Sequence, residues 1–159
     1  MTNKHESQIR NKSLLYPNIS YQVQGAIFEV ANKYGKGLKE NIYQKALAEE
    51  FAKRGIKFEE QKRINIYSLE TGKILGTYVP DFVIDNKIIL EIKATEFATK
   101  QDLNQQRSYL KASIYEIAYL VNFSTPKLFI KRSIYTNDRK SFIIQITNHE
   151  SKTGTNEHK

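Results

Sequence analysis

The sequence predicts an α/β fold, a single domain with a mixed central β-sheet flanked by helices. Its 159 residues are a usual length for one domain. Apolar residues recur at helical spacing in the first third of the chain and then alternate with the period of two that is typical of strands. Because hairpin-like strands precede a strand–helix–strand segment, we expect both antiparallel and parallel strand pairs.

Two helices are expected at the start of the domain, after a flexible polar arm over residues 1–18. Apolar residues at helical spacing predict the first helix over 20–34, with Ser20 as its N-cap. A second amphipathic pattern predicts a helix over 38–54 that ends at Gly55.

Strands make up most of the remaining chain. Segments 57–68 and 74–85 alternate like strands, and the isoleucine-rich segment 88–95 is expected to be the central strand. The later expected elements are a helix over 99–113, strands over 117–123 and 128–135, and an edge strand over 141–147. The domain is therefore expected to span residues 19–148, followed by a disordered tail over 149–159.

Composition excludes several kinds of chemistry. The chain has no cysteine, which excludes disulfides, thiolate nucleophiles and zinc–thiolate sites. Its three histidines, His5, His149 and His158, lie near the chain ends, which argues against a histidine-based catalytic or metal site. A net charge of +8 favours a polyanionic partner such as nucleic acid. No long apolar run is present, so we expect a soluble, cytoplasmic protein that does not bind a membrane.

Three charged residues form the strongest candidate site. Glu91 and Lys93 are two residues apart on a predicted strand, so their side chains share one face, opposite the apolar one. A three-residue hairpin loop would bring Asp81 of the preceding strand beside Glu91. The expected cross-strand pairs are Ile84 with Ile88, Phe82 with Leu90, and Asp81 with Glu91.

This arrangement suits a metal site that hydrolyses phosphodiesters. Two carboxylates facing each other repel unless a cation lies between them, and oxygen ligands suit Mg²⁺ or Mn²⁺. Lys93 is placed to orient or deprotonate a water molecule and to stabilise a phosphorane-like transition state. The alternative interpretation is that Asp81 only begins a strand, while Glu91 and Lys93 form a solvated ion pair.

Further motifs accompany these three residues in a characteristic order. Residues 37–43 read Gly-Leu-Lys-Glu-Asn-Ile-Tyr, and residues 105–109 give a QxxxY pattern, Gln-Gln-Arg-Ser-Tyr. With Asp81 and the run Glu91-Ile92-Lys93 between them, the chain resembles the PD-(D/E)xK nuclease superfamily and, more narrowly, the bacterial GxxExxY proteins. The resemblance covers residues 20–135 and implies a restriction-endonuclease-like core.

The resemblance also implies roles for individual residues. Asp81 and Glu91 would hold the metal with the backbone carbonyl of Ile92, and Glu40 would add a carboxylate beside it. Gln105 and Tyr109 lie four residues apart on one helix face and would line the site. The alternative for Glu40 is helix-dipole stabilisation in a first turn, and for the other two an ordinary helix surface.

These observations together predict a Mg²⁺- or Mn²⁺-dependent nuclease that acts on nucleic acid, DNA rather than RNA. Two alternatives remain open: a catalytically silent nucleic-acid-binding module of the same fold, and a protein-interaction subunit. Because the chain adds little around the core of the fold, a homodimer or a protein partner is a further hypothesis.

Overall fold

The computed structural model describes residues 15–97 and 99–153 of the chain. Five strands form a mixed sheet in the order β1-β4-β5-β6-β7, in which β5 and β6 are parallel and the other neighbours antiparallel. Strands β2 and β3 form a separate two-stranded hairpin. The elements are α2 (Pro17–Tyr34), α3 (Glu40–Lys53), β1 (Phe58–Glu60), β2 (Ile64–Tyr67), β3 (Ile74–Tyr78), β4 (Phe82–Ile84), β5 (Ile88–Lys93), α4 (Lys100–Lys111), β6 (Ile117–Asn122), β7 (Phe129–Ile134), a 3₁₀ turn (Asn137–Arg139) and α5 (Phe142–Thr153). The predicted single α/β domain with a mixed sheet is confirmed.

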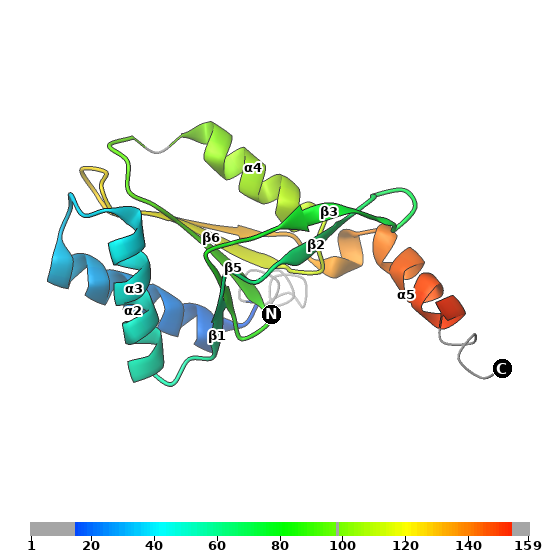
Figure 1. Cartoon of the computed structure of the whole chain (residues 1–159), viewed down its shortest axis with the longest axis horizontal. Coiled ribbons are helices and arrows are strands. Elements are labelled where there is room, and N and C mark those ends of the chain that lie inside the picture. The colour runs from blue at the N-terminus through cyan, green and yellow to red at the C-terminus, as the bar shows by residue number, and fades with distance from the viewer. Residues whose placement is uncertain (1–14, 98, 154–159) are drawn as a thin grey trace, which may run out of the picture.

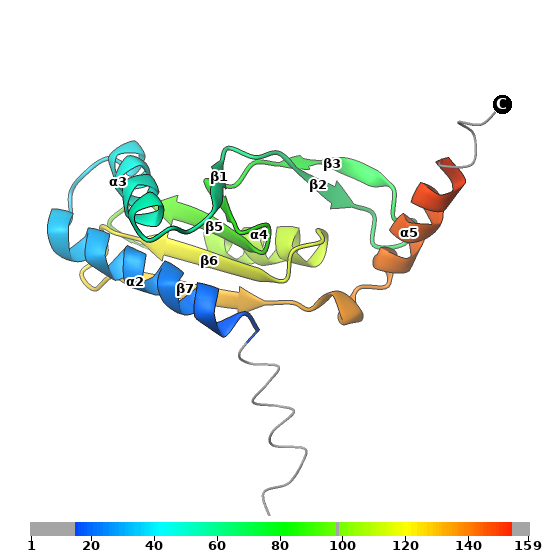
Figure 2. The same ribbon diagram turned by 90° about the horizontal axis from the view of Figure 1, so that it is seen from below.

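The helices lie on both faces of the large sheet (Figures 1 and 2). Helices α2 and α3 pack on one face and build the larger apolar core, and α4 covers the other face over a smaller one. On β5, Leu90 and Ile92 belong to the larger core and Ile89 to the smaller. Because side chains alternate along a strand, Glu91 and Lys93 face the α4 side.

The hairpin between β4 and β5 has the predicted register. Phe82 pairs with Leu90, and Ile84 pairs with Ile88. The loop is the expected three residues, and both Asp85 and Asn86 adopt positive φ, 51° and 53°. Asp and Asn tolerate this left-handed conformation better than most residues, so the local sequence specifies the turn and thereby the register.

The first helix begins earlier than predicted. It starts at Pro17, the first helical position, rather than at Ser20. Proline suits that position because its φ is already helical and its missing N–H would have had no partner there. Residues 1–14 of the predicted arm lie outside the described part of the chain. The second helix begins at Glu40, two residues after the predicted start.

The two long predicted strands are each divided. Segment 57–68 becomes β1 and β2, with the positive φ of Gln61, 54°, at the break between them. Segment 74–85 becomes β3 and β4, separated by Val79, Pro80 and Asp81. As a result β1 and β4 join the large sheet, while β2 and β3 leave it as a hairpin on the side away from α2 and α3 (Figure 1).

The predicted edge strand over 141–147 is wrong, because all but the first residue of this segment lie within helix α5. Its β-branched residues favour a strand locally. Phe142, however, is fully buried, and its ring stacks on Tyr67 of the β2–β3 hairpin with centroids 5.6 Å apart. The predicted tail over 149–159 begins inside this helix, and its residues 154–159 lie outside the described part of the chain. Of the helices described, none has the length and apolarity needed to cross a bilayer.

Candidate active site

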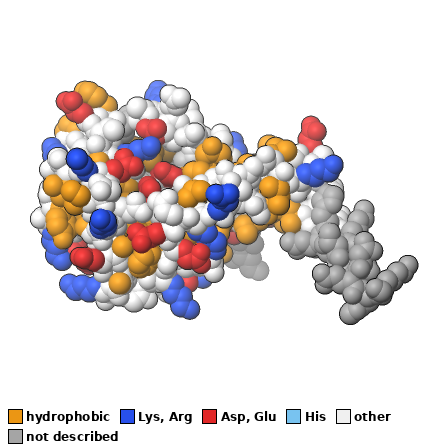
Figure 3. Space-filling view, viewed as in Figure 1, with side chains coloured by type: hydrophobic (Ala, Val, Ile, Leu, Met, Phe, Trp, Pro, Cys, Tyr) orange, Lys and Arg blue, Asp and Glu red, His pale blue; other side chains and the backbone are white. Residues whose placement is uncertain are grey.

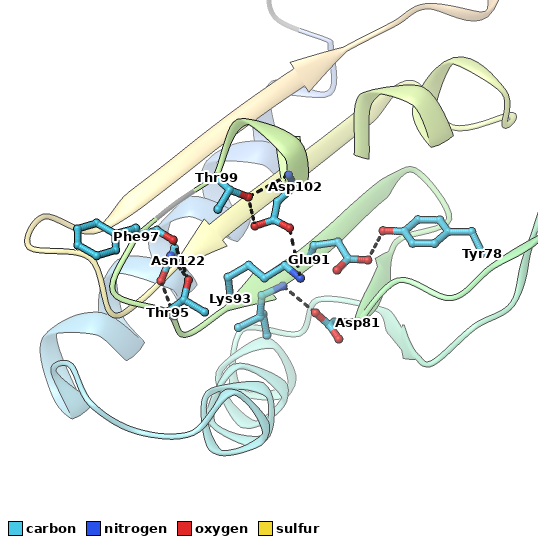
Figure 4. A network of polar contacts seen from close by, with 10 residues as sticks. Tyr78, Asp81, Glu91, Lys93, Thr95, Phe97, Thr99, Asp102 and Asn122 are labelled. Atoms are coloured by element: carbon cyan, nitrogen blue, oxygen red, sulfur yellow. Dashed lines mark hydrogen bonds and ion pairs between the residues drawn. The ribbon is translucent and has the colours of Figure 1, made fainter. Parts of the chain in front are cut away.

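The β4–β5 hairpin brings the predicted carboxylates and lysine to one place (Figure 4). Asp81 stands just before β4, and its Oδ2 accepts a hydrogen bond of 2.7 Å from the backbone N–H of Ile92. This bond ties Asp81 across the hairpin to the segment that carries Glu91 and Lys93. All three charged residues are half-buried. The predicted grouping therefore follows from the register of one hairpin.

Glu91 accepts a hydrogen bond from one tyrosine, and a second tyrosine packs against the first. The Tyr78 hydroxyl at the end of β3 donates a hydrogen bond to Glu91 Oε1. The Tyr78 ring stacks on Tyr109 of α4, with centroids 4.2 Å apart and planes 17° apart. Burial and the negative charge and hydrogen bond of Glu91 raise the pKa of Tyr78, so this phenol stays a donor. The β2–β3 hairpin and α4 thus together fix the Glu91 carboxylate.

Lys93 faces a carboxylate from the start of α4. Its Nζ lies 3.9 Å from Oδ1 of Asp102. Thr99 is the N-cap of α4, since its Oγ1 accepts a hydrogen bond from the Asp102 N–H at 3.2 Å and donates one to Asp102 Oδ2 at 2.6 Å. The N-cap of α4 therefore holds Asp102 in a position where its carboxylate attracts the ammonium group of Lys93.

Glu40 enters the site through the Gly-x-x-Glu-x-x-Tyr segment. Gly37 has a φ of 93°, a conformation that residues with a Cβ rarely adopt. Tyr43 is fully buried, donates a 2.6 Å hydrogen bond to the Gly35 carbonyl and stacks on Phe123. Glycine thus shapes the turn before α3, and tyrosine ties the helix back to it. Between them, Glu40 is presented as the first residue of α3.

The carboxylates of this cluster influence one another. Desolvation, followed by the charge of Asp81, raises the pKa of the Glu40 carboxyl. Burial raises the pKa of Asp81, although the Ile92 N–H and the charge of Lys93 oppose the rise. Burial likewise raises the pKa of Glu91 to about 7, with the charges of Asp81 and Glu40 adding to it. The site thus concentrates negative charge that one lysine compensates only in part, and Figure 3 shows acidic side chains gathered on this hollowed face.

Gln105 and Tyr109 of α4 both line a small pocket against the sheet, as their four-residue spacing predicts. The pocket also includes Glu91, Lys93 and Asp102, whereas Asp81 and Glu40 lie outside its lining. Gln105 is exposed and Tyr109 is half-buried. Both side chains therefore lie beside the charged cluster, where a phosphate oxygen or a water molecule could be reached.

The candidate ligands of this site are oxygen atoms, which suit a hard divalent cation, but their number is small. Over residues 15–97 and 99–153, no group of three or more His, Cys, Asp or Glu side chains that could hold a metal ion is found. Asp81 and Glu91 each use one carboxylate oxygen in a hydrogen bond, and within the same residues the other oxygen accepts none. Two carboxylates, a backbone carbonyl and water suit Mg²⁺, which keeps several of its waters. A cation would also relieve the like-charge repulsion in the cluster.

Comparison with known proteins identifies the family. A sequence model described as the PD-(D/E)XK nuclease superfamily matches residues 17–133. The chain belongs to this superfamily. The match runs from the start of α2 to the penultimate residue of β7 and so contains every residue assigned to the candidate site. A search of curated proteins found no match.

Solved structures with a similar arrangement include an alkaline exonuclease, LHK-Exo, from Laribacter hongkongensis. One LHK-Exo structure shares 12% identity with the chain at a TM-score of 0.39, covering 68% of this chain and 62% of that one. The complex of LHK-Exo with dAMP shares 14% identity at a TM-score of 0.43, covering 86% and 77%. In the first comparison the chain matches less than two thirds of the exonuclease. Because both scores are below 0.5, the superfamily assignment depends on the sequence match.

Three residues of this candidate site were not among the predicted ones. The sequence around Tyr78 does not indicate its role, because that role arises from its contact with Glu91, which lies in the other sheet. Asp102 could have been found, because Thr99-x-x-Asp102 is a helix-start pattern. Gln106, next to the predicted Gln105, is the buried glutamine, and its Nε2 donates to the Tyr119 carbonyl at 2.8 Å. Gln106 therefore ties α4 to β6 and supports the site from behind.

Proposed function

We propose that this chain is a divalent-metal-dependent nuclease that hydrolyses DNA phosphodiester bonds, and that within its superfamily it is a GxxExxY protein. The observation that carries the proposal is the convergence of Glu40, Asp81, Glu91 and Lys93 at one end of the sheet. These side chains come from α3, the turn before β4, and β5. Asp81, Glu91 and Lys93 are half-buried, whereas Glu40 is exposed. Half-buried charge gathered from separate elements is costly to fold, so it favours a functional site.

The proposed mechanism divides the work among these residues. Asp81 and Glu91 would hold a Mg²⁺ or Mn²⁺ ion with the Ile92 carbonyl, and Glu40 would assist directly or through water. Such an ion would supply positive charge that polarises the phosphodiester. Lys93 orients the attacking water and stabilises the charge that develops on the phosphate. Gln105 and Tyr109 contact the phosphate from the α4 side of the pocket.

Two further features support this proposal. A net charge of +8 favours a polyanionic substrate, and we propose DNA in preference to RNA. The physical roles of Gly37, Glu40 and Tyr43 agree with a Gly-x-x-Glu-x-x-Tyr motif in which the turn and the helix position one carboxylate. A homodimer or a protein partner is compatible with this proposal and is tested by the mass of the protein in solution.

A second candidate is a catalytically silent nucleic-acid-binding module of the same fold. The observation that favours it is that no group of three or more candidate metal ligands is found among the described residues. It predicts DNA binding without cleavage, and binding that survives Asp81→Ala because the substitution removes negative charge. The nuclease proposal instead predicts that this substitution abolishes turnover.

A cleavage assay tests the nuclease proposal. Supercoiled, linear and single-stranded DNA are incubated with the wild type, Asp81→Ala and Lys93→Ala in Mg²⁺, Mn²⁺ or EDTA. We expect metal-dependent cleavage by the wild type and a loss on the order of 100-fold or more in both variants. Glu59→Ala, which removes an exposed carboxylate on β1, is the matched control and should cut normally. The mechanism is wrong if both site variants are folded, as circular dichroism reports, and cut DNA at the wild-type rate.

A further inference from the structure

One aromatic side chain beyond the charged cluster is exposed close to it. Phe97 lies in the loop between β5 and α4, four residues after Lys93, and is 72% exposed. Four residues span at most about 14 Å of extended chain, so the ring stays within the length of about four stacked nucleotides of the site. An exposed phenyl ring beside a proposed phosphodiester site is a natural surface for a nucleobase.

The loop that carries Phe97 is held by hydrogen bonds to the buried side chain of Asn122. This residue ends β6 and is 1% exposed. Its Oδ1 accepts hydrogen bonds from the N–H groups of Thr95, at 3.3 Å, and Ser124, at 3.0 Å, and its Nδ2 donates to Thr95 Oγ1 at 3.1 Å. Thr95 Oγ1 in turn donates to the Phe97 carbonyl at 2.9 Å. A buried amide thus holds the loop backbone directly before the exposed ring (Figure 4).

The loop lies at the same end of the sheet as the charged cluster. Because β5 and β6 are parallel, the loops that follow Lys93 and Asn122 leave the same edge of the sheet. Exposed lysines flank this edge from three segments: Lys39 before α3, Lys100 at the start of α4 and Lys127 in the β6–β7 loop. Acidic residues also lie at this edge: Glu96 beside Phe97, the exposed Glu40 beside Lys39, and Asp102 in the first turn of α4. The edge therefore combines a stacking surface with charges suited to a phosphate backbone.

We propose that Phe97 is a binding site for an unpaired nucleobase within about four nucleotides of the scissile phosphate. A ring stacks on a base most readily where the base is unpaired, because the base faces inside a continuous duplex are covered by their neighbours. The inference deepens the proposed nuclease function and rests on it, because it assigns the substrate class: nucleic acid with a single-stranded segment rather than a fully paired duplex. Phe97 positions this strand, and Lys39, Lys100 and Lys127 contact its phosphates.

The chain contains no tryptophan, which allows a direct optical test. Phe97→Trp introduces a single tryptophan at the proposed stacking site, and its fluorescence can be excited selectively in the presence of the ten tyrosines. Leu75→Trp does the same on β3 at a residue that is also 72% exposed and lies outside the site. Both proteins are titrated in EDTA with a single-stranded oligonucleotide and with the matching blunt duplex. We expect the single strand to quench the fluorescence of Phe97→Trp, and to leave Leu75→Trp unchanged. Equal quenching of the two proteins, or stronger quenching by the duplex, would overturn the proposal.

A second measurement uses affinity in place of fluorescence. Phe97→Ala should weaken binding of the single-stranded oligonucleotide about tenfold and that of the duplex by less than about twofold. Phe97→Tyr keeps an aromatic face and should restore single-strand binding. Equal losses on both substrates would overturn the stacking role.

Both measurements are independent of cleavage, so the two proposals can fail separately. If only the single strand quenches the fluorescence of Phe97→Trp and the protein never cuts DNA, the stacking site is supported and the nuclease proposal is contradicted. Cleavage without any quenching in Phe97→Trp would overturn the stacking site alone.

Discussion

Glu91 is held half-buried on β5, where burial raises its pKa to about 7 and the charges of Asp81 and Glu40 add to the rise. In the unfolded chain its pKa returns to the ordinary value of 4.5. Between these two values the folded protein binds more protons than the unfolded one, so its free energy of unfolding falls as pH rises. Glu91 therefore costs stability at and above neutral pH, which fits a residue kept for chemistry rather than for folding.

The first prediction concerns this cost. Glu91→Gln removes the charge but keeps an oxygen that accepts the Tyr78 hydrogen bond. We expect the variant to gain about 1–3 kcal/mol in unfolding free energy above pH 7, and to lose the advantage as pH falls toward 4.5. Urea unfolding at several pH values measures it. Glu49→Gln, at an exposed residue of α3, is the control and should change little. A gain that does not depend on pH would contradict the electrostatic explanation.

Tyr78 gives the second prediction. Its hydroxyl favours the charged form of Glu91, so Tyr78→Phe should raise the pKa of Glu91 further while keeping the stack on Tyr109. We expect nuclease activity at neutral pH to fall about tenfold and to recover as pH rises, because a charge-assisted hydrogen bond is lost. A pH–rate profile is the measurement. Tyr67→Phe in the same hairpin is the control, and a uniform loss at all pH values would indicate a different role for Tyr78.

At the scale of elements, the turn before α3 depends on one tyrosine. Tyr43→Phe keeps the stack on Phe123 but leaves the Gly35 carbonyl without its donor. We expect a loss of about 1 kcal/mol in stability, seen as a drop of roughly 2–4 °C in melting temperature. Activity should fall more steeply than stability predicts, because Glu40 is positioned by this turn. Tyr34→Phe, an exposed residue at the end of α2, is the control. Full activity in Tyr43→Phe would separate the tyrosine from the site.

Elements also show which parts of the structure the sequence can predict. The β4–β5 hairpin was predictable because a three-residue turn and alternating apolar residues specify the same register, and this pairing groups Asp81 with Glu91 and Lys93. Helix α5 was not predictable from its β-branched residues, because the buried ring of Phe142 on the β2–β3 hairpin decides its placement. The Tyr78 contact with Glu91 was missed for the same reason. Local periodicity carries no information on contacts between separate sheets.

At the scale of the whole molecule, the fourth prediction concerns the net charge and the proposed binding of DNA. The chain carries a net charge of +8 although its candidate site is acidic, so the proposed binding of DNA would depend on lysines and arginines outside the site. We expect the dissociation constant for an oligonucleotide to rise at least about tenfold between 50 and 200 mM salt, because counterions are released on binding. Fluorescence anisotropy measures it. Affinity that does not change with salt would argue against a phosphate-contacting surface.

Mn²⁺ binding is the measurement that tests the central claim most directly. Electron paramagnetic resonance of free Mn²⁺ is followed as wild type, Asp81→Ala–Glu91→Ala and a control, Glu49→Ala–Glu59→Ala, are added. Both variants remove two carboxylates, but the control removes exposed ones. We predict that the wild type and the control bind Mn²⁺ and that the site variant does not. Absence of binding in the wild type, or equal binding by the site variant, would contradict a metal-dependent centre at these residues.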